Sequence, residues 1–294
     1  MSSFLSFLIG GISLGSVYAI IALGYTMVYG IAKMLNFAHG DIIMVGAFVA
    51  FVALTKAGLS PVLCILLSIV VCTILGITIE RIAYKPLRGA SSLSVLITAI
   101  GVSYFLQNAA LLVFGADSKT FTSLISFEGI TFAGGEVRVS GVTIITIITC
   151  VVIMLALTAF INKTKTGQAM LAVSQDKGAA TLMGINANRT IAITFAIGSA
   201  LAAVAGILLC SAYPTLSSTT GAMPGIKAFT AAVFGGIGSI PGAFIGGLIL
   251  GIIENLSKAY ISSQLSDAIV FGVLIVVLLV RPTGLLGKNV QEKV

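Results

Sequence analysis

Long stretches without a charged side chain dominate this sequence and limit what the chain can fold into. Eight such stretches are 1–32, 42–55, 57–79, 89–116, 139–162, 190–226, 228–253 and 268–280. A helix that crosses a bilayer needs about 20 apolar residues, and most of these stretches are long enough. Only 9% of the residues are charged, whereas soluble domains carry about 25%. The sequence therefore predicts an all-α polytopic membrane protein.

The distribution of Lys and Arg predicts which loops face the cytoplasm. The segments 80–92, 163–189 and 281–294 hold ten of the sixteen basic residues, and cytoplasmic loops are enriched in such residues. Placing these segments inside also brings Lys33 inside and makes 115–138 the longest external loop. We therefore expect one transmembrane domain over residues 1–294, with an external N-terminus and a cytoplasmic C-terminus.

The stretch 228–253 conflicts with a simple count of crossings, because one crossing there would place the basic C-terminal tail outside. Its centre reads FGGIGSIPGAFIGG (234–247), and the glycines and Pro241 interrupt a helix. We therefore expect two crossings here, or a hairpin that dips into the membrane. The whole chain would then make about eight to nine transmembrane passes, some of them short or broken.

Few polar groups interrupt the apolar stretches, and these are the candidates for a solute path: Asn36, His39, Gln107, Asn108, and the turn residues Gly235, Gly236, Gly238 and Ser239. Main-chain groups exposed at such glycines are tolerated in a bilayer only where water or protein lines them. The structural alternative is hydrogen bonding between helices and close packing at glycines. For His39 and Asp41, a proton relay competes with an interfacial position where water satisfies both.

The sequence lacks the motifs of an enzyme. His39 is the one histidine, and the four cysteines lie in apolar stretches without metal-ligand spacing. Gly287-Lys288 lacks the upstream glycine spacing of a nucleotide-binding loop. We expect no catalytic residue, no metal, no cofactor and no nucleic-acid partner, since the cytoplasmic bias of basic residues explains the net charge of +7.

One polar segment between two apolar stretches carries no visible chemistry. Residues 164–185 read TKTGQAMLAVSQDKGAATLMGI. Helical spacing gathers mostly small residues on one side, and Gly184 supplies a stop signal. These residues are Ala169, Ala172, Val173, Asp176, Ala180 and Met183. A short helix of this kind is shaped to dock against another protein, and a solvated connecting loop is the alternative.

Six segments, in one order and nearly end to end, carry a family resemblance. They are SLGSVYAIIALGYTMVYGI (13–31), LNFAHGD (35–41), IERIAYKPLR (79–88), AIGVSYFLQN (99–108), GQAMLAVSQDKGAATLMGIN (167–186) and KAFTAAVFGGIGSIPGAFIGGLILGIIE (227–254). With these segments the chain resembles the membrane permeases of ABC importers for branched-chain amino acids, the LivH family.

The resemblance implies a pore-forming subunit with several partners in the plasma (inner) membrane of a bacterium or archaeon. A homologous second permease would pair with it, and two cytoplasmic ATPase subunits would bind ATP. An extracytoplasmic binding protein would deliver leucine, isoleucine or valine. Urea, short amides or other amino acids on the same scaffold are alternative substrates. A secondary transporter or channel that works without ATP is the alternative mechanism.

The resemblance also assigns a role to the polar segment. The loop at about 163–189 would carry a cytoplasmic coupling helix that inserts into a groove of an ATPase. The positions that match the family's loop are Gly167, Ala172, Asp176, Ala179, Ala180 and Gly184. Lys177-Gly178 stands where the family often has an acidic residue before the alanine pair, so this contact differs from the family's pattern.

Overall fold

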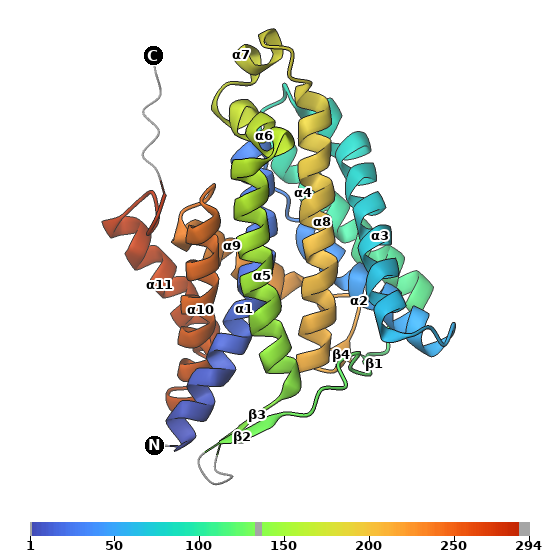
Figure 1. The fold of residues 1–294 in the computed structure, drawn as a ribbon, viewed down its shortest axis with the longest axis vertical. Helices are drawn as coiled ribbons and strands as arrows, with labels where there is room; N and C mark the ends of the chain where they lie inside the picture. The colour runs from blue at the N-terminus through green and yellow to red at the C-terminus, as the bar shows by residue number, and fades with distance from the viewer. Residues whose placement is uncertain (1, 133–136, 288–294) are drawn as a thin grey trace.

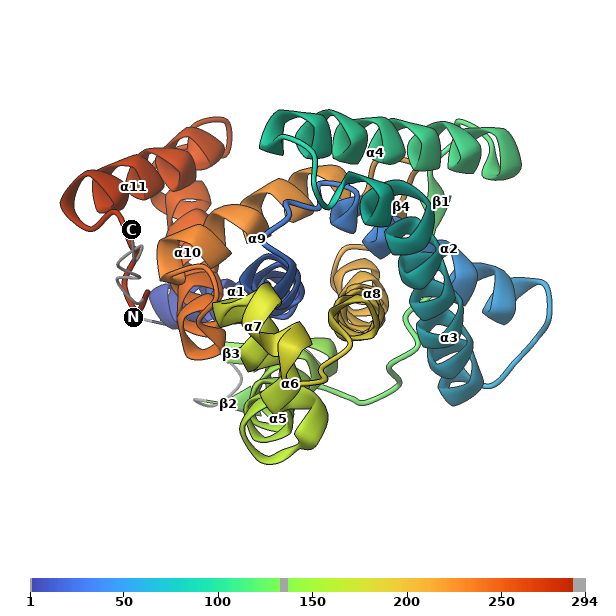
Figure 2. The same cartoon turned by 90° about the horizontal axis from the view of Figure 1, so that it is seen from above.

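Long helices form where the sequence is apolar for more than about 20 residues. The computed structural model describes residues 2–132 and 137–287. Within these ranges, six helices are long and apolar enough to cross a membrane. They are α1 (Ser2–Ala32), α3 (Pro61–Ile79), α4 (Ser92–Phe114), α5 (Gly141–Lys163), α8 (Ala187–Ala212) and α10 (Ile240–Tyr260). Most of them run lengthwise through the molecule (Figure 1), whereas α4 is strongly tilted (Figure 2).

Three shorter helices complete the apolar bundle: α2 (His39–Thr55), α9 (Ala222–Gly235) and α11 (Ser266–Val280). The 14 residues of α9 extend for about 21 Å, less than the roughly 30 Å of a hydrocarbon core. This mixture of full-length and short helices confirms the predicted fold class, an all-α polytopic membrane protein with broken or short helices.

The interruption predicted within 228–253 lies between α9 and α10. Gly236 and Gly238 adopt positive φ values of 105° and 93°, a region that glycine enters without steric cost. Ser239 then caps α10, because its hydroxyl accepts a hydrogen bond from the Gly242 N–H at 3.2 Å. The chain turns back at this point, and α9 packs against α10. Both arrangements expected here contain this turn; α10 is long enough for a full crossing, whereas α9 is too short for one.

The two ends of the bundle differ. One end, at the top of Figure 1, carries the short helices α6 (Lys165–Gln175) and α7 (Lys177–Leu182). The other end carries the predicted 115–138 cap, where β2 (Ile130–Phe132) pairs with β3 (Val137–Val139) and β1 (Lys119–Thr120) pairs with β4 (Thr215–Leu216), both antiparallel. Residues 133–136 of this cap lie outside the described residues, as do Lys288 and Lys293 of the tail.

Helix α1 lies near the centre of the bundle, with α5, α8, α9 and α10 around it (Figure 2). Its closest neighbour is α10, because Gly251 faces Gly15 and Gly247 faces Ala19 with almost no space between the main chains. A Cβ atom on Gly251 would collide with the Gly15 main chain. The two GxxxG steps of α10 therefore serve close helix packing, as such steps do in lipid.

Candidate functional site

Helices α2 and α9 begin inside the bundle and next to each other. A Cβ atom on Gly40, in the first turn of α2, would lie 2.6 Å from the carbonyl oxygen of Gly221, the residue before α9. The two main chains therefore touch at the starts of both helices. The His39 ring lies against Gly24, about 12 Å from the end of α1. Two helix N-termini, with their unsatisfied N–H groups, thus meet at an interior level of the bundle.

Polar side chains gather around the start of α2. Asp41, 2% exposed, accepts a hydrogen bond of 2.8 Å from Nε2 of Gln107 on α4. Its carboxylate lies in the first turn of α2, where a negative charge is favourable. Asn36 accepts a hydrogen bond of 2.9 Å from the hydroxyl of Tyr84, in the π-helix η1 (Glu80–Tyr84). Three of the four polar candidates, Asn36, His39 and Gln107, therefore surround one helix start.

Asn108 does not join this group. It is exposed on α4, and its side-chain amide donates to the Tyr104 carbonyl in the preceding turn at 2.7 Å. An exposed amide within a membrane helix meets lipid, a partner protein or a solute path. A role of Asn108 in transport stays a prediction, as do the roles of Asn36, His39 and Gln107.

The interfacial interpretation of His39 and Asp41 is wrong, because the side chains are buried among helices. His39 is 1% exposed, and its ring packs edge-on against Tyr25 with centroids 4.7 Å apart. Its Nε2 has no hydrogen-bond partner among the described residues, which is costly for a buried polar atom. The sequence places both residues shortly after Lys33, which is expected on the cytoplasmic side, but the chain after Lys33 runs back into the bundle before α2 begins.

The turn residues Gly235, Gly236, Gly238 and Ser239 lie elsewhere, at the end of the bundle that carries α6 and α7. The Gly235 carbonyl accepts a hydrogen bond from Leu286 N–H at 2.9 Å, so the chain after α11 covers part of this turn. The structure does not bring these residues together with the group around Asp41. Their contribution to a solute path remains a prediction.

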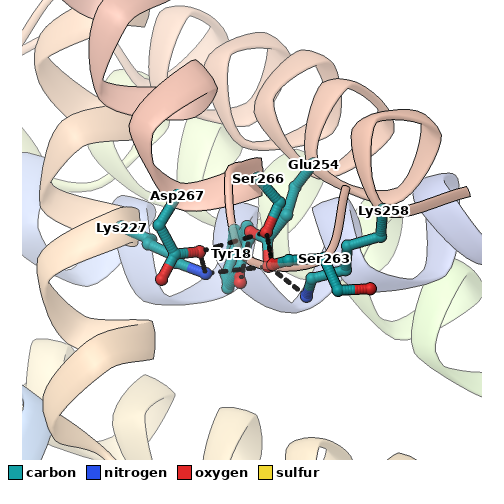
Figure 3. Close-up of polar contacts among 7 residues, drawn as sticks. All are labelled: Tyr18, Lys227, Glu254, Lys258, Ser263, Ser266 and Asp267. Carbon is teal, nitrogen blue, oxygen red and sulfur yellow. Dashed lines mark hydrogen bonds and ion pairs between the residues drawn. The ribbon is translucent and has the colours of Figure 1, made fainter. Parts of the chain in front are cut away.

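A network of ionisable side chains ties four helices together, and the sequence pattern alone does not predict it. Figure 3 shows Tyr18 of α1, Lys227 of α9, Glu254 and Lys258 of α10, and Asp267 of α11 in contact. Glu254 accepts hydrogen bonds from the Tyr18 hydroxyl and Lys227 Nζ at 2.8 Å each and from Lys258 Nζ at 2.5 Å. Lys227 also lies 2.6 Å from Asp267 Oδ1.

In the sequence, Lys227 and Glu254 flank the charge-free stretch 228–253, a position where a charge usually meets water. The structure places Lys227 inside α9 at 6% exposure and Glu254 inside α10 at 1% exposure. One feature of the sequence could have predicted this pair: Lys227 and Glu254 carry opposite charges and stand at the two ends of a stretch that is expected to turn back on itself. Such a hairpin brings its ends together, and buried charges require partners.

The polar segment between α5 and α8 forms two helices, so the expectation of one continuous helix is wrong. The break falls at Asp176, whose side chain accepts a hydrogen bond from the Ala179 N–H at 2.9 Å and thereby caps α7. Aspartate favours this capping position over a helix interior, because its carboxylate bonds the free N–H groups of the next turn. The helical face predicted from Ala169 to Met183 therefore does not exist as one surface.

The six matched positions of this segment divide between buried and exposed. Gly167 packs against Phe160 and Ile161 of α5, Ala180 is 4% exposed and Ala172 is half-buried. Asp176, Ala179 and Gly184 are exposed. Their role in coupling remains a prediction.

The largest apolar side chains that project from this segment are Leu182, 90% exposed, and Met183, 83% exposed. Sequence spacing did not single them out as a pair. A groove of about 550 Å³ lies beside them and is lined by Lys177, Thr181, Gly184, Ile185, Asn186, Ala187 and Asn188. Exposed apolar side chains beside a polar groove are typical of a protein contact.

Comparison with known proteins gives matches over nearly the whole chain. Residues 7–278 match the family described as branched-chain amino acid transport system, permease component. The chain is 46% identical to the high-affinity branched-chain amino acid transport system permease protein BraD of Pseudomonas aeruginosa, over 99% of this chain and 98% of BraD. It is 47% identical to the protein of the same description, LivH, of Escherichia coli K12, with the same two coverages.

A solved structure has a similar fold. The structure described as PsaBC from Streptococcus pneumoniae in complex with Fab superimposes with a TM-score of 0.50, over 94% of this chain and 92% of that chain. The sequence identity is 15%, so this likeness concerns the fold alone.

Proposed function

The chain belongs to the family of branched-chain amino acid transport permease components, and from this premise we propose that it is the membrane permease subunit of an ABC importer for leucine, isoleucine and valine. The observation that carries the proposal is the identity of 46% to 47% with two high-affinity branched-chain amino acid permeases over nearly the full length of each chain. The multi-pass helical bundle supplies the membrane domain that such a subunit needs.

In this proposal the chain has no ATPase site of its own, and two separate ATPase subunits bind ATP at the cytoplasmic end. A second homologous permease completes the pore, and an extracytoplasmic binding protein delivers the amino acid. The end with α6 and α7 is cytoplasmic, as is the C-terminus. Lys163, Lys165, Lys177 and Arg281 at this end agree with the cytoplasmic enrichment of basic residues.

The contact with an ATPase is formed by α7 and the turn after it. Leu182 and Met183 would leave water on docking, and the capped start of α7 at Asp176 holds them in place. Burying two such side chains favours binding by about 1.5 to 3 kcal/mol each. Ala180 of the same helix is buried in the permease itself and so helps to hold this surface in position. The surface transmits force and performs no chemistry.

Variants at the exposed pair test this proposal. Leu182→Asp with Met183→Asp should release the ATPases on purification and abolish ATP-dependent leucine uptake, while the permease remains folded in the membrane. Ile261→Asp is a matched control, because Ile261 is 66% exposed and follows α10 at the opposite end of the bundle. Retention of the ATPases and of uptake by the double variant would exclude this docking surface.

The alternative that works without ATP gains one observation from the structure. Lys227, Glu254 and Asp267 are ionisable groups within membrane helices, where such groups often mark ion pathways. Uptake that collapses when the proton gradient is dissipated at constant ATP would favour a secondary transporter. Uptake that follows ATP alone would assign the network a structural role.

A further inference from the structure

A second cavity lies at the α6–α7 end of the bundle, apart from the proposed ATPase contact. It has a volume of about 270 Å³ and opens between the end of α1 and the connection from α3 to α4. Lys33, Arg88 and Ser92 line it together with Leu35, Leu87 and Val95. Because α1 and α4 are membrane-spanning helices that end or begin here, the cavity lies at the depth of the lipid headgroups.

The charges of the cavity favour an anion. Among the described residues that line it there are two cations and no carboxylate; one of the two, Arg88, is paired with the nearby buried Glu80. The Lys33 side chain is exposed, so its ammonium group can reach an anion in the cavity. Arg81 and Lys85 lie exposed on the same connection, on η1 and on the 3-10 turn η2 (Lys85–Leu87). Clusters of basic residues beside membrane helices attract anionic headgroups.

Arg88 lines the cavity and is held in place by two partners. The two terminal nitrogens of its guanidinium bond to Glu80 and Asn188, which fixes the side chain, and that side chain is 9% exposed. Its Nε is buried and has no hydrogen-bond partner in the described parts of the chain. A buried guanidinium N–H without an acceptor is costly. Because Arg88 lines the cavity, its guanidinium contributes positive charge beside a bound anion.

The start of α4 adds main-chain donors. Ser91 caps this helix and accepts from the Ser94 N–H at 3.3 Å, whereas the first N–H groups of a helix, here those of Ser92 and Leu93, have no acceptor within the helix. Helix N-termini of this kind bind phosphate oxygens. Lys33, Arg88 and the start of α4 therefore meet at one cavity from three separate segments.

We propose that this cavity binds the phosphate group of an anionic phospholipid, of which phosphatidylglycerol is the test case. The apolar side chains Leu35, Leu87 and Val95 would contact the glycerol backbone and the upper acyl chain, a surface that a free phosphate ion does not need. An amino acid fits less well, because its ammonium group would find two cations and no carboxylate. The proposal does not depend on the transported substrate.

The test uses the purified transporter complex and counts bound lipids by native mass spectrometry during titration with phosphatidylglycerol or phosphatidylcholine. Phosphatidylglycerol should bind more tightly than phosphatidylcholine, and Lys33→Gln should weaken it about fivefold, the effect of one cation near the surface. Ser92→Pro should also weaken it, because proline removes one N–H but is well tolerated at the first helical position. Unchanged binding in both variants would overturn the proposal.

Lys85→Gln is the matched control, because it removes the same charge from the same connection but from a side chain outside the cavity. An equal loss of binding in Lys85→Gln and Lys33→Gln would overturn the proposal in favour of a diffuse charge effect. Displacement of the lipid by inorganic phosphate at equal concentration would assign the site to a free anion instead. Displacement by leucine would assign it to the substrate, and either result contradicts a lipid site.

Discussion

Lys227 Nζ lies 2.8 Å from Glu254 Oε1, and both side chains are almost completely buried between α9 and α10. The same ammonium group contacts Asp267 at the start of α11, and the Tyr18 hydroxyl of α1 donates a hydrogen bond to Glu254. A short helix such as α9 cannot fix its own position by spanning the membrane. The network therefore fixes α9 against three neighbours, α1, α10 and α11, through the sixth residue of the helix.

Removing the central cation should destabilise the protein. Lys227→Met leaves Glu254 buried without its main partner, and breaking a buried pair in this way costs about 3 to 5 kcal/mol. Lys258→Met is the control, because the Lys258 side chain is 41% exposed and such a pair contributes only about 0 to 1 kcal/mol. Thermal unfolding of the two variants in the same detergent should show a large loss for the first alone. Equal losses would mean that the network acts as a surface cluster.

The hydrogen bond between Asp41 and Gln107 should likewise stabilise the protein, because it holds α4 against α2. Gln107→Leu removes the hydrogen bond to a buried carboxylate, and losing a bond to a charged group costs about 1.5 to 3 kcal/mol. Asn108→Leu, one residue along, should have little effect, because its amide is exposed and bonds only within α4. Thermal unfolding of the two variants checks this expectation. An unchanged unfolding temperature of the Gln107→Leu variant would show that Asp41 finds another partner.

The close approach of α1 and α10 gives a third prediction. Gly251→Ala places a methyl group against the Gly15 main chain, and overpacking of this kind costs about 1 to 3 kcal/mol or more. Gly272→Ala in α11 is the matched control, because a Cβ atom there has no neighbour within 4 Å. We expect a reduced yield of folded protein for the first and a neutral or slightly stabilising effect for the second. A well-folded Gly251→Ala variant would contradict the packing described for α1 and α10.

Much of the fold follows from the sequence because hydrophobicity and charge act locally. The charge-free stretches predict the six long helices, and Pro241 with its neighbouring glycines predicts the turn between α9 and α10. Register between distant helices does not follow from such patterns. The interior start of α2 depends on the contact of Gly40 with Gly221, and no local feature of either segment predicts that they meet.

The candidate sites were predictable to different degrees. The segment 164–185 is recognisable as a polar interlude, but the break at Asp176 turns its predicted face into two helices. Leu182 and Met183 are ordinary apolar residues in the sequence, and only their exposure distinguishes them. Lys227, Glu254 and Asp267 do not stand out in the sequence, because a charge at the end of an apolar stretch usually lies in water. Their pairing depends on a hairpin whose geometry the sequence only suggests.

The most direct measurement of the central claim is leucine uptake into proteoliposomes that contain the purified complex, its binding protein and a proton ionophore. If the chain is the permease of an ABC importer, radiolabelled leucine should accumulate only when ATP is supplied on the ATPase side, and the ionophore should not reduce the uptake. Leu182→Asp with Met183→Asp should abolish accumulation while the lipid vesicles retain the permease. Leucine uptake without ATP, or uptake abolished by the ionophore at constant ATP, would contradict the account.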